Sequence, residues 1–273
     1  MNSSPFHSRY WSDWTSEAFS RLDRSRLIAV LPVGATEQHG PHLPMSTDTA
    51  TIDGMVQAAI RHLPPELPAL FLPTMAYGKS NEHSRYPGTL TVSASTLIAL
   101  WSEIGACVAA AGVRKLVLFN SHGGQMSVMD IVARDLREKY SMMTVAANWY
   151  TLGLPGGMFE EHEMKHGIHA GDLESSIMLK LTPDHVRREN FKNFPSLTEK
   201  LAKEGRFLSI SPSGKLGWQT QDINPEGAAG DATRATADKG EAVLDHVGQR
   251  FVELLQEIDR FPIARLDNAP AWT

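Results

Sequence analysis

Cysteine is almost absent from this sequence: Cys107 is the single one among 273 residues. One cysteine cannot form a disulfide within the chain or build a thiolate zinc cluster. Any metal site must therefore consist mainly of histidine, aspartate and glutamate. The low cysteine content is compatible with a reducing compartment, and we expect a cytoplasmic protein.

Long apolar runs and clusters of one charge are absent too. No apolar run approaches the roughly 20 residues that cross a bilayer. Residues 1–7 lack the basic-then-apolar pattern of a secretion signal. The formal net charge is −5, and lysine and arginine do not cluster in any one stretch. We therefore expect neither a membrane nor a nucleic acid as a partner, because a nucleic-acid surface needs clustered positive charge.

Short apolar runs alternate along the chain with segments of helical periodicity. The apolar fraction of 42% is enough for a sizeable core. Strands are expected at 27–33, 69–72, 115–120 and 143–149, and helices at 49–62, 93–111, 126–140, 172–181 and 237–258. This alternation predicts an α/β fold with a mostly parallel sheet. Residues 184–235 are rich in glycine, proline and serine and are expected to be irregular.

No linker divides the sequence, so residues 1–273 are expected to form a single domain. The N-terminal segment 1–25 carries four aromatic residues, Tyr10, Trp11, Trp14 and Phe19. Because large aromatic side chains are usually buried, this segment is expected to pack on the main domain or on a neighbouring subunit.

The stretch from Glu37 to Asp48 is the densest source of possible metal ligands. It places two carboxylates and the imidazoles of His39 and His42 among several prolines, directly after the first predicted strand. Prolines remove donors and clash in a helix, so the stretch is expected to be a rigid loop.

Two later loops, each after a predicted strand, also carry possible ligands. They are His122 in the second loop, and His162, His166, His169, Asp172 and Glu174 in the third. Because the carboxyl ends of parallel strands meet at one edge of a sheet, these groups are expected to converge. Imidazole and carboxylate ligands suit Zn²⁺, Mn²⁺ or Fe²⁺ better than Ca²⁺.

Several segments, in order along the chain, resemble the motifs of the creatininase (creatinine amidohydrolase) family. The first is E-Q-H-G-P-H-L-P from Glu37, followed by Thr47-Asp48. N-S-H-G-G-Q at 120–125 resembles N-x-H-G-G-N, and H-A-G-D-L-E-S-S at 169–176 resembles H-A-G-E-x-E-T-S. Glu82-His83, P-G-T at 87–89, G-D-A from 230 and A-D-K-G at 237–240 also fit.

The resemblance implies a three-layer αβα sandwich, a hexamer and a hydrolytic site with two divalent ions per subunit. Carried over by motif, Asp48 bridges the ions, Glu37 and His122 complete one site, and His39 and Glu174 complete the other. Zn²⁺ is the first expectation, with Mn²⁺ or Fe²⁺ as alternatives. Three carboxylates would offset three of four positive charges, and the remaining charge would acidify a bridging water to serve as the nucleophile.

Proton transfer to a leaving nitrogen needs a titratable group beside the metals. His169 is the first candidate, because the pKa of histidine lies near neutrality, and His42, His166 and Asp172 follow. His42 and His166 are equally expected to orient ligands instead. Gly123 and Gly124 are expected to let the backbone approach the substrate or to form a plain turn. Trp149, Tyr150 and Phe159 either wall the pocket or pack in the core, and His166 also counts as a substrate-binding candidate.

One position departs from the creatinine-hydrolysing members. Those members have a metal-binding glutamate two residues after the second-loop histidine, where this chain has Gly124. Glu174 is expected to replace it, as in the H-G-G branch of the family, which makes creatinine an unexpected substrate. That branch includes enzymes acting on formamidopyrimidine intermediates of deazaflavin synthesis and a peptidase-like member that trims the mycofactocin precursor.

The sequence therefore predicts a metal-dependent amidohydrolase with a small-molecule substrate. The bond cleaved is expected to be a C–N bond of a cyclic amide, a formamide or a small linear amide. Three alternatives stay open: a peptidase-like member trimming a short peptide, a non-catalytic metal-binding member, and a metal-dependent sugar isomerase.

Overall fold

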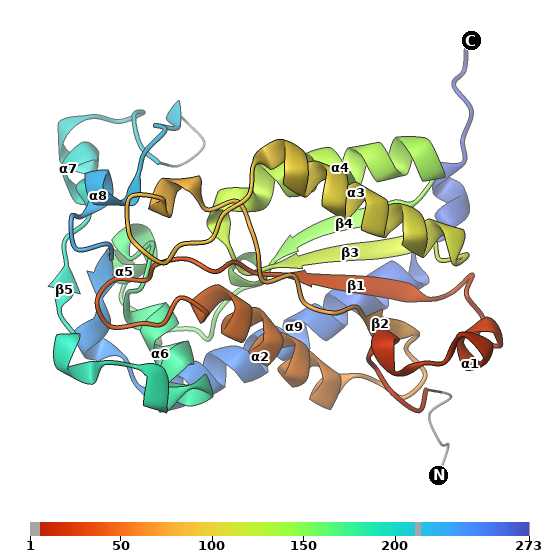
Figure 1. Ribbon diagram of the computed structural model, residues 1–273, viewed down its shortest axis with the longest axis horizontal. Helices are drawn as coiled ribbons and strands as arrows, with labels where there is room; N and C mark the ends of the chain where they lie inside the picture. Colours follow the sequence, from red (N-terminus) through yellow and green to blue (C-terminus); the bar gives the residue numbers. More distant parts are fainter. Residues whose placement is uncertain (1–5, 211–213, 273) are drawn as a thin grey trace.

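A four-stranded parallel sheet forms the centre of the computed structural model, which describes residues 6–210 and 214–272 (Figure 1). The strand order is β2-β1-β3-β4. The strands are β1 (Ile28–Val33), β2 (Ala69–Phe71), β3 (Lys115–Asn120) and β4 (Met143–Asn148). Ile28 of β1 lies opposite Ala69 of β2 and Lys115 of β3. The predicted strands and their parallel pairing are confirmed.

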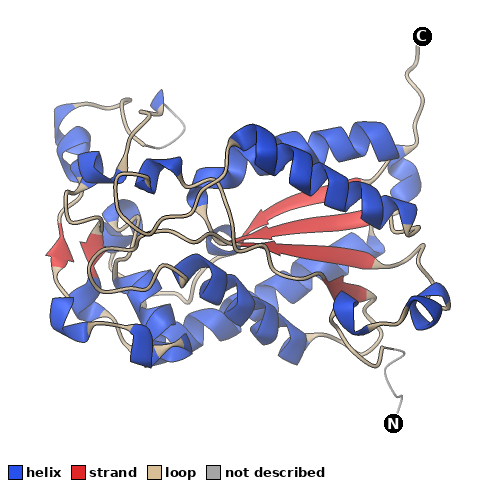
Figure 2. Ribbon diagram, viewed as in Figure 1, coloured by secondary structure: helices blue, strands red, loops and turns tan. Residues whose placement is uncertain are grey.

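Helices cover both faces of this sheet (Figure 2). One face carries α2 (Thr47–His62), α6 (Asp172–Leu181) and α9 (Ala237–Arg260), and the other carries α3 (Ala94–Ala110) and α4 (Met126–Tyr140). Alternate side chains of a strand point to opposite faces. Val117 and Phe119 of β3 accordingly join the core beneath α2 and α9, whereas Leu116 and Leu118 join the core beneath α3 and α4. The three-layer αβα sandwich is confirmed.

Close helix packing depends on two glycines of α9. A Cβ at Gly240 would overlap the carbonyl oxygen of Ser176 in α6, and one at Gly248 would lie 2.8 Å from a backbone atom of Ala58 in α2. Helix α9 can therefore approach both neighbours backbone to backbone. The aromatic ring of Phe251, on the same helix, stacks on Phe119 of β3 with centroids 3.7 Å apart.

The segment between α6 and α9 is more ordered than the sequence predicts. A two-stranded antiparallel sheet pairs β5 (Asn193–Phe194) with β6 (Gly230–Asp231). The helices here are α7 (Leu197–Glu204), α8 (Thr220–Ile223) and the 3₁₀ turns η5 (Pro183–His185), η6 (Arg188–Asn190) and η8 (Ala232–Arg234). Residues 211–213 of the region predicted to be irregular lie outside the described residues.

The remaining short helices lie in the N-terminal segment, in the loops around the sheet and near the C-terminus. They are η1 (Trp11–Asp13), α1 (Ser16–Ser20), η2 (Asn81–His83), η3 (Gly123–Gln125), η4 (Trp149–Thr151), α5 (Glu161–His166) and η9 (Ile263–Leu266). The predicted loop after β4 thus contains a helix, α5.

Three of the four aromatic side chains of the N-terminal segment pack on the domain itself, and the fourth, Tyr10, is exposed. Trp11, Trp14 and Phe19 lie against the core beneath α3 and α4. Arg9 donates hydrogen bonds to the carbonyls of Pro64 and Leu67. A role of this segment at a subunit interface stays a prediction, as does the single-domain assignment, and residues 1–5 and 273 lie outside the described residues. No helix in the described ranges has the length and apolarity needed to cross a membrane.

Candidate metal centre

The strand ends bring the predicted ligands together. The carboxyl ends of the strands point toward the half of the molecule that holds α5 to α8 (Figure 1). The loop after β1 contains Glu37 and His39 and leads to Asp48 in the first turn of α2. His122 follows β3, and Glu174 lies in the first turn of α6. Glu174 is partly exposed, and the other four residues are buried.

Asp48 is shared by two groups of possible ligands. In the first group, His122 Nδ1 lies 3.2 Å from Glu37 Oε2 and 3.5 Å from Asp48 Oδ2. In the second, His39 Nε2 lies 3.9 Å from both Asp48 Oδ1 and Glu174 Oε2. Within each group, the possible ligand atoms all lie within 4.8 Å of one another. The two oxygens of Asp48 thus face different groups, as a bridging carboxylate would require.

Three of these ligand atoms lack any hydrogen bond. Among the described residues, Glu37 Oε2, His39 Nε2 and Asp48 Oδ2 are buried and have no hydrogen-bond partner. A buried polar atom without a partner is costly. Divalent cations between these atoms would satisfy all three, so the residues present fit a metal site.

Backbone carbonyls orient both imidazoles. His39 Nδ1 donates to the carbonyl of Glu37 at 3.0 Å, and His122 Nε2 donates to that of Lys79 at 2.9 Å. The other nitrogen of each ring therefore faces the carboxylates, which is the arrangement that metal-binding histidines need. Glu174 is fixed in a similar way, because its Oε2 accepts a hydrogen bond from the backbone N–H of Ala170.

Electrostatic interactions differ between the two buried carboxyls. Burial and the charge of Glu37 raise the pKa of Asp48 well above its usual value. Burial alone would raise the pKa of Glu37 too. The neighbouring His122 and His83 outweigh this effect, so the pKa of Glu37 is lowered. Burial would lower the pKa of His122, yet Glu37 and Asp48 raise it to about 10. Without a cation, this cluster therefore retains a proton on His122, and a metal ion would have to displace it.

A cavity of about 670 Å³ opens beside the ligands. His169, Gly123, Gly124, Trp149 and Tyr150 line it, together with Glu37, Asp48, His122 and Glu174. The ring of His169 lies 4.2 Å from that of His39, and His169 Nε2 donates to the carbonyl of Gln38 at 2.9 Å. His169 is therefore a fixed imidazole between the ligand cluster and the open space.

Besides the predicted ligand His39, which lies behind the wall, three predicted site residues do not line the cavity. His42 Nε2 bonds the carbonyl of Ala170 at 2.8 Å, and its ring stacks on Phe194. His166 Nδ1 bonds Thr198 Oγ1, and the carboxylate of Asp172 pairs with Lys239 Nζ at 2.5 Å. These bonds turn the three side chains away from the cavity. His162, an exposed side chain beside Glu199, and Phe159, which packs against the core beneath α2 and α9, are not at the cavity either.

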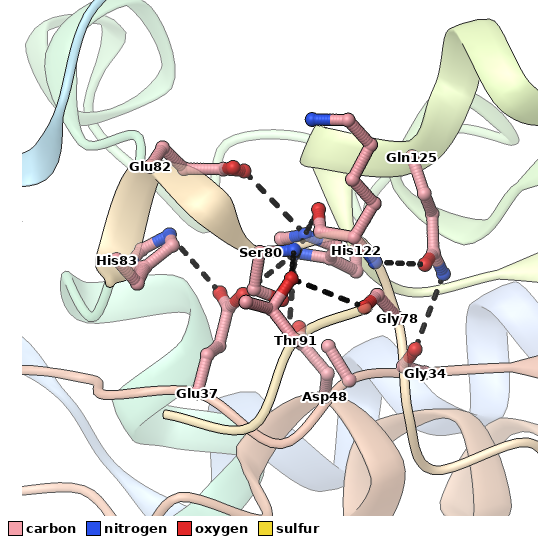
Figure 3. A network of polar contacts seen from close by, with 12 residues as sticks. Gly34, Glu37, Asp48, Gly78, Ser80, Glu82, His83, Thr91, His122 and Gln125 are labelled. Atoms are coloured by element: carbon pink, nitrogen blue, oxygen red, sulfur yellow. Dashed lines mark hydrogen bonds and ion pairs between the residues drawn. The ribbon is translucent and has the colours of Figure 1, made fainter. Parts of the chain in front are cut away.

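Sequence reasoning missed several residues of the site. His83 is buried, and its Nε2 lies 3.2 Å from Glu37 Oε1 (Figure 3). Glu82 Oε1 lies 3.5 Å from His122 Nε2. Both come from the loop between β2 and α3, well beyond the end of β2. The pair Glu82-His83 in the family motif and the polar, glycine- and proline-containing loop at 77–90 pointed to this segment, but neither signal assigned a role to the two residues.

Glu163 of α5 is a further buried carboxylate at the cavity. Its Oε1 accepts from the backbone N–H of Asp172 at 2.7 Å, and its Oε2 accepts from that of Asp231 at 2.9 Å. A Cβ at Gly167 or Gly171 would overlap this carboxylate. Glu163 therefore holds the start of α6, with Glu174 in its first turn, against β6.

Comparison with known proteins finds a family whose sequence pattern this chain matches. The family model described as "Creatininase: Creatinine amidohydrolase" matches residues 12–255. The mycofactocin precursor peptide peptidase of Mycobacterium tuberculosis (strain ATCC 25618 / H37Rv) is 32% identical over 252 residues, covering 89% of this chain and 91% of that protein. The creatinine amidohydrolase of Pseudomonas putida is 26% identical over 254 residues, covering 87% and 92%. The 3-dehydro-scyllo-inosose hydrolase of Thermotoga maritima is 29% identical over 274 residues, covering 91% and 83%.

Solved creatininase structures share the fold. The crystal structure of creatinine amidohydrolase (creatininase) superposes with a TM-score of 0.74 at 24% identity, over 94% of this chain and 100% of that one. A structure named "Creatininase Mn" has a TM-score of 0.73 at 23% identity, over 93% and 100%.

Proposed function

The chain belongs to the creatininase (creatinine amidohydrolase) family of hydrolases, and from this premise we propose that it is a metal-dependent amidohydrolase that cleaves a C–N bond. The observation that carries the proposal is the set of unpartnered buried atoms of Glu37, His39 and Asp48, beside an open cavity whose wall includes Glu37 and Asp48. A site of this kind gives a substrate access to whatever ion the atoms hold.

The proposed centre holds two divalent ions. Glu37, Asp48 and His122 would hold one, and His39, Asp48 and Glu174 the other. Zn²⁺ is the first choice and Mn²⁺ or Fe²⁺ the alternatives, because the ligands are imidazoles and carboxylates. Divalent ions at such sites polarise a carbonyl and lower the pKa of water toward neutrality.

The chain's own residues would position the substrate and move a proton. His169 lines the cavity beside His39, with its Nε2 held by the Gln38 carbonyl, so it is the residue we propose to pass a proton to the leaving nitrogen. Trp149 and the backbone of Gly123 and Gly124 lie in the cavity wall, where they would bind the substrate.

A peptidase-like activity is the second candidate. The cavity of about 670 Å³ exceeds what one small ring needs, and its wall includes apolar side chains, among them Met126, Met164, Leu216 and Trp218. Such a wall suits the side chains of a short peptide. The relatives named mycofactocin precursor peptide peptidase support the same reading.

The partners and location of the protein stay proposals that rest on the family resemblance and on composition. We propose a homo-oligomer, a hexamer by resemblance, in the cytoplasm, with a small-molecule substrate and no nucleic acid or membrane partner.

The proposal is tested with a panel of cyclic amides, formamides, linear amides and short peptides, read by product mass. Hydrolysis adds one water to the products, whereas isomerisation adds nothing. Chelation should abolish turnover, and a divalent metal should restore it. Glu37→Gln and His122→Ala should each lower kcat/KM about a thousandfold, because metal catalysis supplies several kcal/mol.

The control is His185→Ala, a change at an exposed histidine, which should leave turnover intact. Metal-free native protein together with full activity of Glu37→Gln and His122→Ala would contradict the proposal. Turnover confined to the peptides would select the second candidate.

A further inference from the structure

Glu82 occupies the space that the missing side chain of residue 124 would fill. It lies in η2, in the loop between β2 and α3, and its side chain is largely buried. A Cβ on Gly124 would lie 2.5 Å from His122 Nε2 and 2.8 Å from the Lys79 carbonyl oxygen, and closer still to Glu82 Oε1. A side chain at position 124 and the present position of the Glu82 carboxylate therefore exclude each other.

The Glu82 carboxylate faces the outer edge of the His122 ring. Its Oε1 lies 3.5 Å from His122 Nε2, the nitrogen that donates to the Lys79 carbonyl. The opposite ring nitrogen, Nδ1, faces Glu37 and Asp48. Negative charge at the outer edge favours the proton on Nε2 and leaves the lone pair of Nδ1 for a cation. Figure 3 shows Glu82 and Glu37 approaching His122 from different sides.

The loop that carries Glu82 is fixed at several points. Ser80 N–H donates to Thr91 Oγ1 at 2.8 Å, and Thr220 Oγ1 donates to the backbone carbonyl of Glu82 at 3.0 Å. The Lys79 and Glu82 acceptors belong to this one loop, so the loop delivers both to His122 together. These two hydrogen bonds fix the backbone at Ser80 and Glu82, and so hold the Glu82 carboxylate beside the His122 ring.

We propose that Glu82 and Gly124 act as a unit: Gly124 leaves the space through which Glu82 reaches His122, and Glu82 holds His122 in its metal-binding tautomer and orientation. The inference rests on the proposed function, because it takes His122 to bind a metal ion. Glu82 is a positioning residue here, since its oxygen lies on the Nε2 side of the ring while the ligand atoms gather on the Nδ1 side.

The test is the Zn²⁺ dissociation constant of the full-length protein, measured by competition with a chelator. Loss of a carboxylate that supports a metal-binding histidine typically weakens metal binding 10–100-fold. Glu82→Ala should weaken the binding of one Zn²⁺ by about that factor, and Glu82→Gln, which keeps the shape without the charge, should weaken it less. Glu103→Ala, a change at an exposed glutamate of α3, is the control and should bind as the wild type does.

A double-mutant cycle tests the unit itself. Gly124→Ala should weaken Zn²⁺ binding in the wild type, because the new Cβ displaces Glu82 and also crowds His122 Nε2 and the Lys79 carbonyl. In the Glu82→Ala background only the crowding of His122 and Lys79 remains, so the same change should weaken Zn²⁺ binding by a factor at least fivefold smaller. Thermal unfolding of the metal-free variants confirms that each is folded.

The outcomes separate the inference from the function on which it depends. Unchanged Zn²⁺ affinity in Glu82→Ala, or additive effects of the two changes, overturns the inference while the metal site stands. If Glu82→Gln binds Zn²⁺ as tightly as the wild type, Glu82 only fills space, and this result overturns the inference as well. A wild type that binds no Zn²⁺, Mn²⁺ or Fe²⁺ removes the proposed function itself.

Discussion

The role open to each histidine of the site depends on which of its ring nitrogens is already hydrogen-bonded. One ring nitrogen of His39 and one of His122 are already bonded to backbone carbonyls, so the other nitrogen of each ring faces carboxylates. His169 is held by the carbonyl of Gln38 and still reaches the cavity. His42 is as buried as these residues, but its bond to Ala170 and its stacking on Phe194 direct it elsewhere.

His83 is expected to matter for the orientation of Glu37. Its Nε2 lies 3.2 Å from Glu37 Oε1, and its Nδ1 lies 3.0 Å from Thr220 Oγ1. In His83→Ala, Oε1 loses this partner and Glu37 is free to turn, so we expect kcat/KM to fall about 10–100-fold. His62→Ala, which removes a partly exposed histidine paired with Asp245, is the matched control. Equal activity of the two variants would show that Glu37 needs no support from His83.

His42 is expected to make stability depend on pH. Burial lowers the pKa of its imidazole from 6.5 to about 4. Between these values the unfolded chain binds a proton that the folded chain does not, so stability falls as the pH falls from 6.5 toward 4. The loss reaches on the order of 3 kcal/mol, at 1.36 kcal/mol for each pKa unit. Above pH 6.5 this histidine contributes no pH dependence.

Urea unfolding of chelator-treated protein at pH 7 and pH 4.5 measures this effect. His42→Gln should show a smaller drop in unfolding free energy between the two pH values than the wild type. His185→Gln, at an exposed position, should keep the full drop. The same drop in His42→Gln and the wild type would exclude His42 as the source.

The site residues after β1 and β3 could be predicted from the sequence, and the roles of Glu82 and His83 in the loop between β2 and α3 could not. Glu37 and His122 follow continuous apolar runs, and parallel strands bring such positions to one sheet edge. His83 and Glu82 reach the site through a loop whose course depends on hydrogen bonds to remote residues, such as Thr220. No local pattern encodes those contacts.

Helices and strands could likewise be predicted where neighbouring residues carry a sequence signal. Strand β3 is a run of buried side chains, and α3 is capped by Ser93, whose side chain accepts from the N–H of Thr96. These signals lie in adjacent residues, and both elements were predicted. Strand β5 exists because Asn193 pairs with Asp231, far along the chain. Its two residues carry no strand signal of their own, so the segment was predicted to be irregular.

The contact between α6 and α9 is expected to tolerate no side chain at position 240. A Cβ there would overlap the Ser176 carbonyl oxygen and lie 2.6 Å from the carbonyl carbon, and backbone atoms cannot move aside easily. Gly240→Ala should therefore lower the free energy of unfolding by about 1–3 kcal/mol, as overpacking does. Gly205→Ala, where the new Cβ meets nothing within 4 Å, is the control in the same urea titration. A Gly240→Ala protein as stable as the control would contradict the close packing described for α9.

At the scale of the whole molecule, the sandwich supplies a rigid frame and the loops supply the chemistry. Two cores, one on each face of the sheet, fix the strand ends from which Glu37 and His122 project. Helices α2 and α6 add Asp48 and Glu174 from their first turns. The fold and these groups followed from the sequence, whereas the shape of the cavity depends on the contacts of segments 150–174 and 214–218.

The most direct test of the account is the number of divalent ions per chain, measured by elemental analysis of the protein purified without chelator. The wild type should carry two, Glu174→Gln one, and Asp48→Asn fewer than one, because Asp48 faces both groups. Glu103→Gln should carry two, like the wild type. A wild type without divalent metal, or an Asp48→Asn protein that retains both ions, would contradict the shared-carboxylate centre.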